Sequence, residues 1–210
     1  MLVVHHLNNS RSQRILWLLE ELGLDYEIKR YERDPNTMLA PASLKEVHPL
    51  GKSPVITDEG LTLAESGAII DYLVERYGEG QLAPPPGTPE KLRYAYWLHY
   101  AEGSAMPLLV MKLLLDNFGL GDSVASTQFV APQLKLHFDY LEGELGKTTW
   151  FVGEEFTAAD VQMSFPVEAA AAQLGVDASC PKLKGFLERI HARPAYKRAL
   201  ERGGKYELLT

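Results

Sequence analysis

Hydrophobic and polar positions recur along this chain with different periodicities, and each periodicity predicts a helix or a strand. Residues 2–5 are largely apolar and β-prone, and apolar side chains between residues 15 and 22 then recur at helical spacing before Gly23. Residues 26–31 alternate apolar and charged side chains, which is typical of a second strand. The start of the chain therefore predicts a β-α-β unit.

A β-hairpin and another helix follow this unit. The strand-like runs 55–57 and 61–63 flank the turn sequence Asp58-Glu59-Gly60. Apolar side chains then recur at helical spacing from residue 69 to residue 77. The order β-α-β and then β-β-α predicts an α+β domain over residues 1–79.

A proline-rich stretch separates this domain from the rest of the chain. Residues 80–88 contain Pro84-Pro85-Pro86-Gly87, a composition that interrupts both helix and central strand, so we place a linker there. Residues 89–210 show helical patterns and no convincing strand pattern, which predicts an all-α second domain. The expected helical segments lie near residues 90–118, 124–145, 158–174, 182–192 and 194–202.

Composition and charge narrow the class of protein. The chain is 46% hydrophobic and 23% charged, as ordinary soluble globular proteins are. Its formal net charge is -7 without a dense Lys/Arg stripe, so nucleic acid is not an expected partner. No apolar run reaches the roughly 18 residues that span a membrane, and residues 1–9 do not resemble a signal peptide. With a single cysteine, Cys180, the chain has no internal disulfide, and we expect a cytoplasmic protein.

A polar stretch, residues 8–12, separates the first predicted strand from its helix. Ser10 and Gln13 stand three apart, the spacing of a capping box, so Ser10 could be the N-cap. A serine hydroxyl can accept from a helix N–H and also donate to a ligand thiolate. One charge-assisted hydrogen bond contributes about 1.5–3 kcal/mol, enough to lower a thiol pKa by about one to two units. Ser10 is therefore a candidate helix cap and a candidate catalytic residue.

The neighbours of Ser10 are candidates as well. Arg11 and Arg14 could support the charge of a thiolate, although arginines in a first helical turn commonly reach into solvent. Asn8 and Ser12 are rivals to Ser10 for the contact with the sulfur atom.

The histidines do not suggest a metal centre. His5 and His6 would point to opposite faces of the predicted strand, and His48 lies far from both along the chain. We therefore predict no metal site.

Pro54 stands at the start of a predicted strand, in the sequence Gly51-Lys52-Ser53-Pro54-Val55. A proline there loses no ladder hydrogen bond, so it could be an ordinary strand-start residue. The alternative is a cis Ser53–Pro54 bond, because X-Pro linkages adopt cis at low cost. A cis bond would expose the N–H and C=O of Val55 to an extended, peptide-like ligand.

Glu65 and Ser66 stand at the start of the next predicted helix. The N–H groups and the dipole of a helix N-terminus favour an anion. Ser66 could then donate to a carboxylate while Glu65 attracts an ammonium group, which suits the head group of an α-amino acid. An acidic first turn is also common in helices that bind nothing.

The order of elements and five motifs resemble the cytosolic glutathione transferases over nearly the whole chain. The motifs are SRSQRILWLLEELGL, HPLGKSPVI, LAESGAIIDYL, YAEGSAMP and FTAADVQMSFP. They are most similar to a microbial subgroup with a serine-type active site. The resemblance implies a thioredoxin-like N-terminal domain joined to an all-α domain, glutathione as co-substrate without a metal, and a homodimer.

The resemblance also implies roles for residues of the first domain. Ser10 would activate the glutathione sulfur, Pro54 would be cis, and Val55 would pair with the cysteinyl backbone. Glu65 and Ser66 would bind the γ-glutamyl group.

Three further residues enter through the resemblance alone. The glycyl carboxylate of glutathione would lie near His48 or Lys52, and Lys52 is favoured because lysine keeps its charge at pH 7. Glu102 would approach the γ-glutamyl ammonium. The chain has neither the tyrosine nor the cysteine of other active-site types, so disulfide reduction through a protein thiol is not expected.

A pocket for the second substrate is expected on the first helix of the second domain. There Tyr96, His99, Tyr100, Met106 and Met111 mix aromatic and soft side chains, which suits a hydrophobic electrophile. Helical spacing places most such side chains in a core, so only some of them would face a ligand.

Two functions remain open at this point. The leading hypothesis is an enzyme that holds glutathione as thiolate for attack on an electrophile or a peroxide, and peroxidase or isomerase activity would use the same thiolate. The alternative is a glutathione-binding or interaction module without catalysis, because a fold does not guarantee activity.

One motif of the second domain is expected to be structural. Thr157-Ala158-Ala159-Asp160 has the form of a capping box. The resemblance implies that it stabilises a buried helix, so Asp160 would be a folding residue and not a catalyst.

Overall fold

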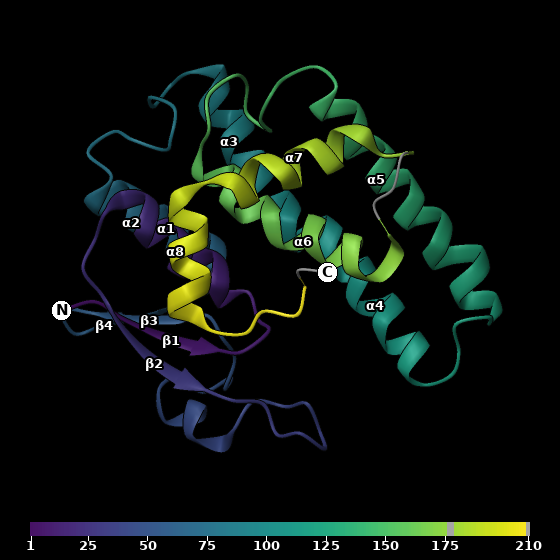
Figure 1. Cartoon of the computed structure of the whole chain (residues 1–210), viewed down its shortest axis with the longest axis horizontal. Helices are drawn as coiled ribbons and strands as arrows, with labels where there is room; N and C mark the ends of the chain where they lie inside the picture. Colours follow the sequence, from purple (N-terminus) through teal and green to yellow (C-terminus); the bar gives the residue numbers. More distant parts are fainter. Residues whose placement is uncertain (176–178, 209–210) are drawn as a thin grey trace. The chain divides into compact units, whose positions relative to one another are not determined.

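The structure, a computed structural model, describes residues 1–175 and 179–208. The chain divides into two compact units. Figure 1 labels their helices and strands. Unit 1 comprises residues 1–82 together with the C-terminal segment from His191, and unit 2 comprises residues 83–190. Among the described residues, no helix is both long and apolar enough to cross a membrane.

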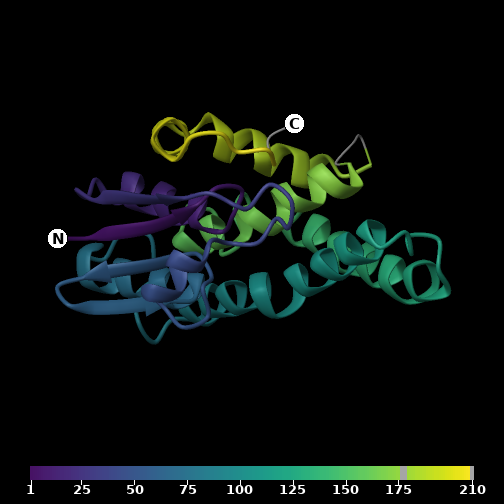
Figure 2. The same cartoon turned by 90° about the horizontal axis from the view of Figure 1, so that it is seen from below.

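Unit 1 is built on a four-stranded mixed sheet of order β2-β1-β3-β4, whose strands lie side by side in Figure 2. Strand β1 is parallel to β2 and antiparallel to β3, and β3 is antiparallel to β4. This confirms the predicted β-α-β and β-β-α order. The elements are β1 (Val3–Leu7), α1 (Ser12–Leu22), β2 (Glu27–Tyr31), η1 (Ala42–Glu46), β3 (Val55–Asp58), β4 (Leu61–Ala64), α2 (Ser66–Tyr77) and α8 (Pro194–Gly203).

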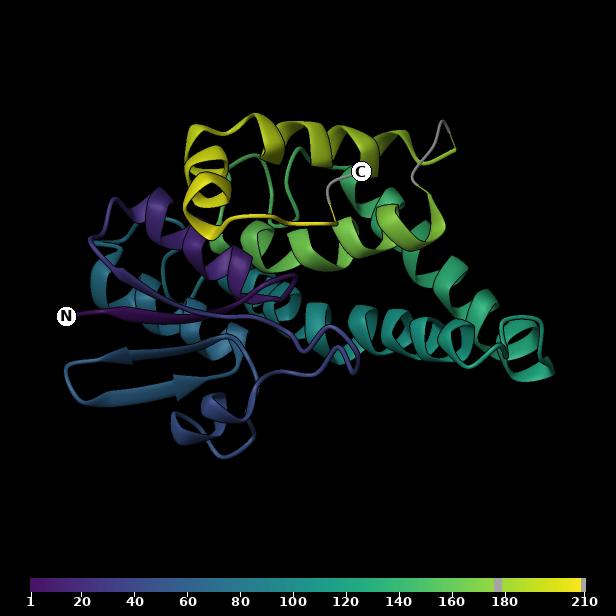
Figure 3. The ribbon, with the colours of Figure 1, turned by 60° about the horizontal axis from the view of Figure 1, so that its bottom comes forward.

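Apolar side chains on α1 and α2 form the core on one side of this sheet. Ile15, Leu19 and Ile70 are fully buried, as the helical spacing predicts. Helix α1 ends at Gly23, whose φ of 65° is in the left-handed region that favours glycine. The short helix η1 lies on the opposite side of the sheet (Figure 3). Its Leu44 packs with Leu7 and Tyr31, the last residues of β1 and β2.

The C-terminal segment packs on α1, within unit 1. The rings of Trp17 and Tyr196 meet edge to face with centroids 5.0 Å apart. Arg193 donates to both carboxylate oxygens of Glu21, at 2.6 and 2.8 Å. The sequence pattern placed this segment in the helical domain, because the pattern is helical and the contacts of the segment lie about 170 residues back along the chain. The ring contact and the ion pair with α1 instead group it with unit 1.

All regular elements of unit 2 among its described residues are helices, as predicted. Its elements are α3 (Pro89–Tyr100), η2 (Ala101–Ala105), α4 (Met106–Asn117), η3 (Ala125–Val130), α5 (Ala131–Leu145), α6 (Ala158–Leu174) and α7 (Pro181–Ala192), whose end leads into the C-terminal segment. Both η2 and η3 are π-helical turns that run directly into the helices after them. Helical periodicity did not distinguish these turns from α-helix.

Aromatic side chains and a buried carboxylate organise the core of unit 2. Trp97 contacts Phe151 with ring centroids 4.7 Å apart, and both are fully buried. Asp160 is also fully buried and accepts from the N–H of Phe151 at 2.8 Å and the N–H of Thr157 at 2.9 Å. Thr157 and Asp160 form the predicted capping box at the start of α6.

Candidate active site

The polar stretch after β1 places two serine hydroxyls together. Helix α1 begins at Ser12 with Arg11 as its N-cap and no side-chain capping bond. Ser10 Oγ accepts a hydrogen bond from the N–H of Ser12 at 3.2 Å. The N–H of Gln13 instead donates to the Ser10 carbonyl oxygen, also at 3.2 Å. The predicted capping box of Ser10 and Gln13 is therefore wrong, because the turn at Ser10 brings its hydroxyl to Ser12 instead.

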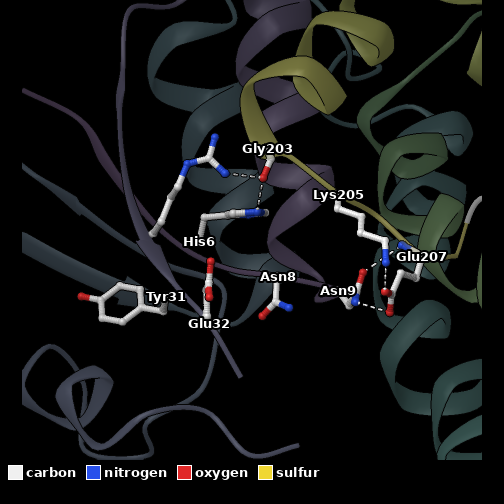
Figure 4. Close-up of a pocket in the computed structure, with 9 residues that line it drawn as sticks. His6, Asn8, Asn9, Tyr31, Glu32, Gly203, Lys205 and Glu207 are labelled. Atoms are coloured by element: carbon white, nitrogen blue, oxygen red, sulfur yellow. Dashed lines mark hydrogen bonds and ion pairs between the residues drawn. The ribbon is translucent and has the colours of Figure 1, made fainter. Parts of the chain in front are cut away.

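The two serines belong to a chain of hydrogen bonds that ends in α8. Ser10 Oγ lies 2.7 Å from Ser12 Oγ, and Ser12 Oγ lies 2.8 Å from His6 Nδ1. His6 Nε2 lies 3.1 Å from the carbonyl oxygen of Gly203, as Figure 4 shows. All three side chains are buried. We call Ser10, Ser12 and His6 the hydroxyl relay.

Burial controls the charge of His6. It lowers the pKa of His6 to about 4, the bond to Gly203 opposes this, and the charge of Arg30 adds to it. His6 is therefore neutral at pH 7. The sequence offered His6 only as a candidate metal ligand, because its partner Gly203 lies 197 residues away along the chain.

Of the two rivals to Ser10, Ser12 lies in the hydroxyl relay, whereas Asn8 is bonded elsewhere in unit 1. Asn8 Oδ1 accepts from the N–H of Arg33 at 2.9 Å, which ties Asn8 to the end of β2. The neighbouring Asn9 exchanges hydrogen bonds with Glu207 at 2.7 and 2.8 Å. Arg11 is half-buried at the N-cap of α1.

Arg14 lies inside unit 1 and supports the start of α2. It is buried, and its Nη2 donates to Ser66 Oγ at 2.8 Å. Ser66 is the first residue of α2, and Glu65 before it is exposed with a φ of 69°. A non-glycine residue at such a φ is strained, and strained residues cluster at functional sites. The structure thus places a carboxylate and a hydroxyl at a helix N-terminus over a buried cation.

The Ser53–Pro54 peptide bond is cis, as the resemblance implied. Val55 is fully buried and lies opposite His5 of β1 and Ala64 of β4. This register leaves no free strand edge at Val55, so the structure does not support ligand pairing there.

Ser53, just before the cis bond, is placed differently. Its Oγ donates to the carbonyl of His5 at 2.8 Å and accepts from the N–H of Leu7 at 3.3 Å. Within the described part of the chain, the backbone N–H and C=O of Ser53 make no hydrogen bond. Ser53 is not among the predicted site residues, because the spacing of strand residues alone does not show which backbone groups remain unpaired.

His48 and Lys52 lie on the loop that leads to the cis bond. Gly51 between them has a φ of 58°, and its N–H donates to the carbonyl of His48 at 2.9 Å. Lys52 is exposed and His48 is half-buried. Buried His48 Nδ1 has no hydrogen-bond partner among the described residues, so a ligand group could use it.

The predicted second-substrate residues belong to unit 2 and differ in exposure. Tyr100 and Met106 are buried, and the Tyr100 hydroxyl lies 2.6 Å from His137 Nδ1. His99 and Met111 are exposed. Glu102 is half-buried in the π-helical turn η2, a kind of turn that is frequent at functional sites.

A cavity of about 250 Å³ adjoins His6 in unit 1 (Figure 4). Arg30 and Lys205 contribute positive charge to its lining, and Glu32 and Glu207 contribute negative charge. These charges balance, so the cavity carries no strong preference for an anion or a cation. Among the described residues, no group of His, Cys, Asp and Glu side chains could hold a metal ion.

The fold and this site together define a class of protein. A thioredoxin-like domain here combines a cis-proline before β3, a polar helix N-terminus at α2 and a serine hydroxyl after β1. Residues 1–75 match the family description "Glutathione S-transferase, N-terminal domain", and residues 114–194 match "Glutathione S-transferase, C-terminal domain". The chain belongs to the glutathione S-transferase family.

Relatives and solved structures agree with this assignment. "Glutathione S-transferase 3" of Schizosaccharomyces pombe is 36% identical, and the match covers 96% of this chain and 88% of that protein. A glutathione S-transferase structure from Actinobacillus pleuropneumoniae is 40% identical with a TM-score of 0.89, covering 99% of this chain and 95% of the other. A family member from Pseudomonas fluorescens, solved with two glutathione bound, is 25% identical with a TM-score of 0.81, covering 95% of this chain and 92% of the other.

Proposed function

We propose that this protein is a glutathione transferase that holds the glutathione thiol as thiolate at Ser10. The thiolate attacks a hydrophobic electrophile or a peroxide. Catalysis comes from stabilising the thiolate and holding it near the second substrate, without a covalent intermediate on the protein.

The observation that carries this proposal is the position of Leu7 between two halves of the site. The N–H of Leu7 donates to Ser53 Oγ, and its carbonyl oxygen lies 3.3 Å from Ser12 Oγ. Leu7 therefore holds the residue before the cis bond and the hydroxyls of the polar stretch at the same end of β1. A cysteinyl residue whose backbone pairs with Ser53 would carry its sulfur toward Ser10.

The remaining groups suit the two ends of glutathione. At one end, Glu65 offers a carboxylate to the γ-glutamyl ammonium, and Ser66 at the helix N-terminus suits the adjacent carboxylate. At the other end, Lys52 and His48 lie on the loop before Ser53 and suit the glycyl carboxylate. We assign Ser53 the backbone pairing that the resemblance gave to Val55.

One hydrogen bond is sufficient to change the state of the thiol. A free thiol has a pKa of about 8.5, and a charge-assisted hydrogen bond of about 1.5–3 kcal/mol lowers it by about one to two units. Thiolate then becomes a major species at pH 7. The helix dipole of α1 adds about 0.3–1 kcal/mol in the same direction.

The test is an ultraviolet difference spectrum of bound glutathione against pH in wild type, Ser10→Ala and Ser43→Ala. Ser43 is an exposed serine of η1 and serves as the matched control. We expect the thiolate band to titrate below the free thiol in wild type and Ser43→Ala, and to move up by about one to two units in Ser10→Ala. Turnover of an aryl halide should fall at least about tenfold in Ser10→Ala, while the glutathione KM changes less.

Two results would contradict the proposal. Unchanged titration and turnover in Ser10→Ala would transfer the role to another donor. Tight glutathione binding with a protonated thiol at pH 7 and no turnover of electrophiles or peroxides would favour the second function, a glutathione-binding module without catalysis.

The second substrate and the homodimer are also proposals. Tyr100, Met106, His99 and Met111 on α3 and α4 remain the candidates for contact with a hydrophobic electrophile, and Glu102 the candidate for the γ-glutamyl ammonium.

An exposed apolar stripe on α4 supports self-association. Val110, Leu113 and Leu114 recur at helical spacing and are 38–49% exposed. Sedimentation equilibrium would test the homodimer, and a monomer at micromolar concentration would contradict it.

A further inference from the structure

The direction of every hydrogen bond in the hydroxyl relay can be assigned, beginning at its far end. The carbonyl oxygen of Gly203 only accepts, so His6 Nε2, 3.1 Å away, carries a proton. His6 is neutral at pH 7, so Nδ1 carries a lone pair and must accept. The donor to Nδ1 is Ser12 Oγ, at 2.8 Å.

This assignment determines where the Ser10 proton points. Ser12 Oγ has a single proton, and its contact with Nδ1 at 2.8 Å is shorter than its contact with the Leu7 carbonyl at 3.3 Å. Having donated to His6, Ser12 accepts from Ser10 across the 2.7 Å contact. When no thiolate is bound, Ser10 therefore directs its proton toward Ser12 and keeps a lone pair for a ligand.

A thiol and a thiolate demand opposite arrangements of the relay. A neutral thiol S–H can donate to the lone pair of Ser10. A thiolate needs Ser10 to turn its proton outward, and Ser12 must then turn its own proton toward Ser10 to keep their contact a hydrogen bond. His6 Nδ1, which is buried, is left without a donor in that case.

Protonation of His6 removes this conflict. With protons on both ring nitrogens, Nε2 still donates to Gly203 and Nδ1 donates to Ser12 Oγ. Ser12 then donates to Ser10, and Ser10 donates to the thiolate, so every group of the relay is satisfied. A neutral ring therefore offsets part of the stabilisation that Ser10 gives a bound thiolate, because Nδ1 loses its donor, whereas a charged ring does not.

We propose that His6, acting through Ser12, is a positioning residue that sets which way the Ser10 proton points, and so links the ionisation of bound glutathione to the protonation of His6. This inference rests on the proposed function of Ser10. By reciprocity, an anion at the sulfur position must raise the proton affinity of His6 as much as a proton on His6 favours the anion.

The charged groups around His6 influence its pKa when no ligand is bound. Arg30 of β2 donates to the same Gly203 carbonyl at 2.7 Å and opposes a charge on the ring. Beyond the ring, Glu32, Lys205 and Glu207 line the adjoining cavity (Figure 4). None of these groups lies in the relay itself, so replacing Ser12 leaves their effect on His6 in place.

The first test follows the ring proton of His6 by NMR titration with two ligands. Glutathione sulfonate is negatively charged at the sulfur position at every pH used, and S-methylglutathione is neutral there. We expect a His6 pKa about one unit higher with the sulfonate in wild type. In Ser12→Ala this difference should disappear, because the path to Ser10 is cut. No difference in wild type, or a difference that survives in Ser12→Ala, would overturn the inference.

The second test measures the thiol pKa of bound glutathione in Ser12→Ala. The variant removes the group that accepts the Ser10 proton, so Ser10 can donate outward without a loss at His6. We expect the thiol pKa to fall, which is opposite to the rise expected for Ser10→Ala. Ser164→Ala, which also removes a buried serine hydroxyl but in unit 2, should leave it unchanged. If the thiol pKa of bound glutathione rises in Ser12→Ala, the inference about His6 fails but the proposed function stands. If wild type forms no thiolate with bound glutathione, both fail.

Discussion

Asp160 gives the most quantitative prediction, because two opposing effects act on one fully buried carboxylate. It accepts from the N–H groups of Phe151 and Thr157 and from the Thr157 hydroxyl, at 2.8, 2.9 and 3.1 Å. Burial raises its pKa to about 6, against these hydrogen bonds, which favour the charged form. The ordinary value is 3.8.

Replacing Asp160 with Ala leaves two buried N–H donors without an acceptor. Each unsatisfied donor costs about 1–3 kcal/mol, so we expect a loss of about 2–6 kcal/mol in the free energy of unfolding where Asp160 is protonated. The variant also removes the cost of ionising a buried acid. Because the folded pKa is raised, the stability that this group contributes is present below about pH 4 and is lost as the pH rises through about 6.

The loss in the free energy of unfolding that Asp160→Ala causes should therefore be larger at low pH. With pKa values of 3.8 unfolded and about 6 folded, the difference between pH 4.5 and pH 7.5 is about 2 kcal/mol. Urea unfolding of both proteins across this range measures it, and all other titrating groups cancel in the comparison. Asp139→Ala, at an exposed aspartate of α5 paired with Lys135, should cost less than about 0.5 kcal/mol at every pH.

If the loss in the free energy of unfolding is the same at every pH, or grows as the pH rises, the pKa of Asp160 is not raised. Unchanged stability of Asp160→Ala at all pH values would refute the structural role of the capping box itself.

Two further predictions concern unit 1. Glu21→Ala removes the carboxylate that Arg193 contacts at 2.6 and 2.8 Å, and it should lower the free energy of unfolding by about 2–3 kcal/mol in urea unfolding. A value within about 0.5 kcal/mol of wild type would show that the ion pair does not hold the C-terminal segment. Glu65→Gly relieves the strain of a φ of 69° and should raise the free energy of unfolding by about 1 kcal/mol. The same variant should weaken glutathione binding in calorimetry, and an unchanged affinity would show that Glu65 is not part of the site.

Local patterns predicted much of the fold and part of the site. The burial of Ile15 and Leu19, the order of the strands along the chain and the capping box of Asp160 all follow from spacings within one element or between neighbours in sequence. The polar stretch around Ser10 was also visible, because a break between strand and helix is a local signal. The π-helical turns were not, since a π turn hardly disturbs apolar periodicity over a few residues.

Contacts between distant segments decided the rest. The cis-bond argument and the resemblance assigned the ligand backbone to Val55, but the pairing of β3 with both β1 and β4 leaves no free edge there. The backbone groups of Ser53 are the ones without a hydrogen bond in the described part of the chain. Likewise, the sequence could offer His6 only as a candidate metal ligand. Its bond to Gly203 exists because α8 packs on α1 within unit 1.

The sequence by itself determined the elements, their order, the family and the residue types available for chemistry, because these depend on local periodicity and on motifs of neighbouring residues. Only the tertiary structure decided which backbone groups remain unpaired, which side chains are buried and which side chains lie within hydrogen-bonding distance of Ser10 and Ser12. These properties depend on hydrogen-bond partners and solvent exclusion supplied by segments far away in the chain, and no local pattern records them.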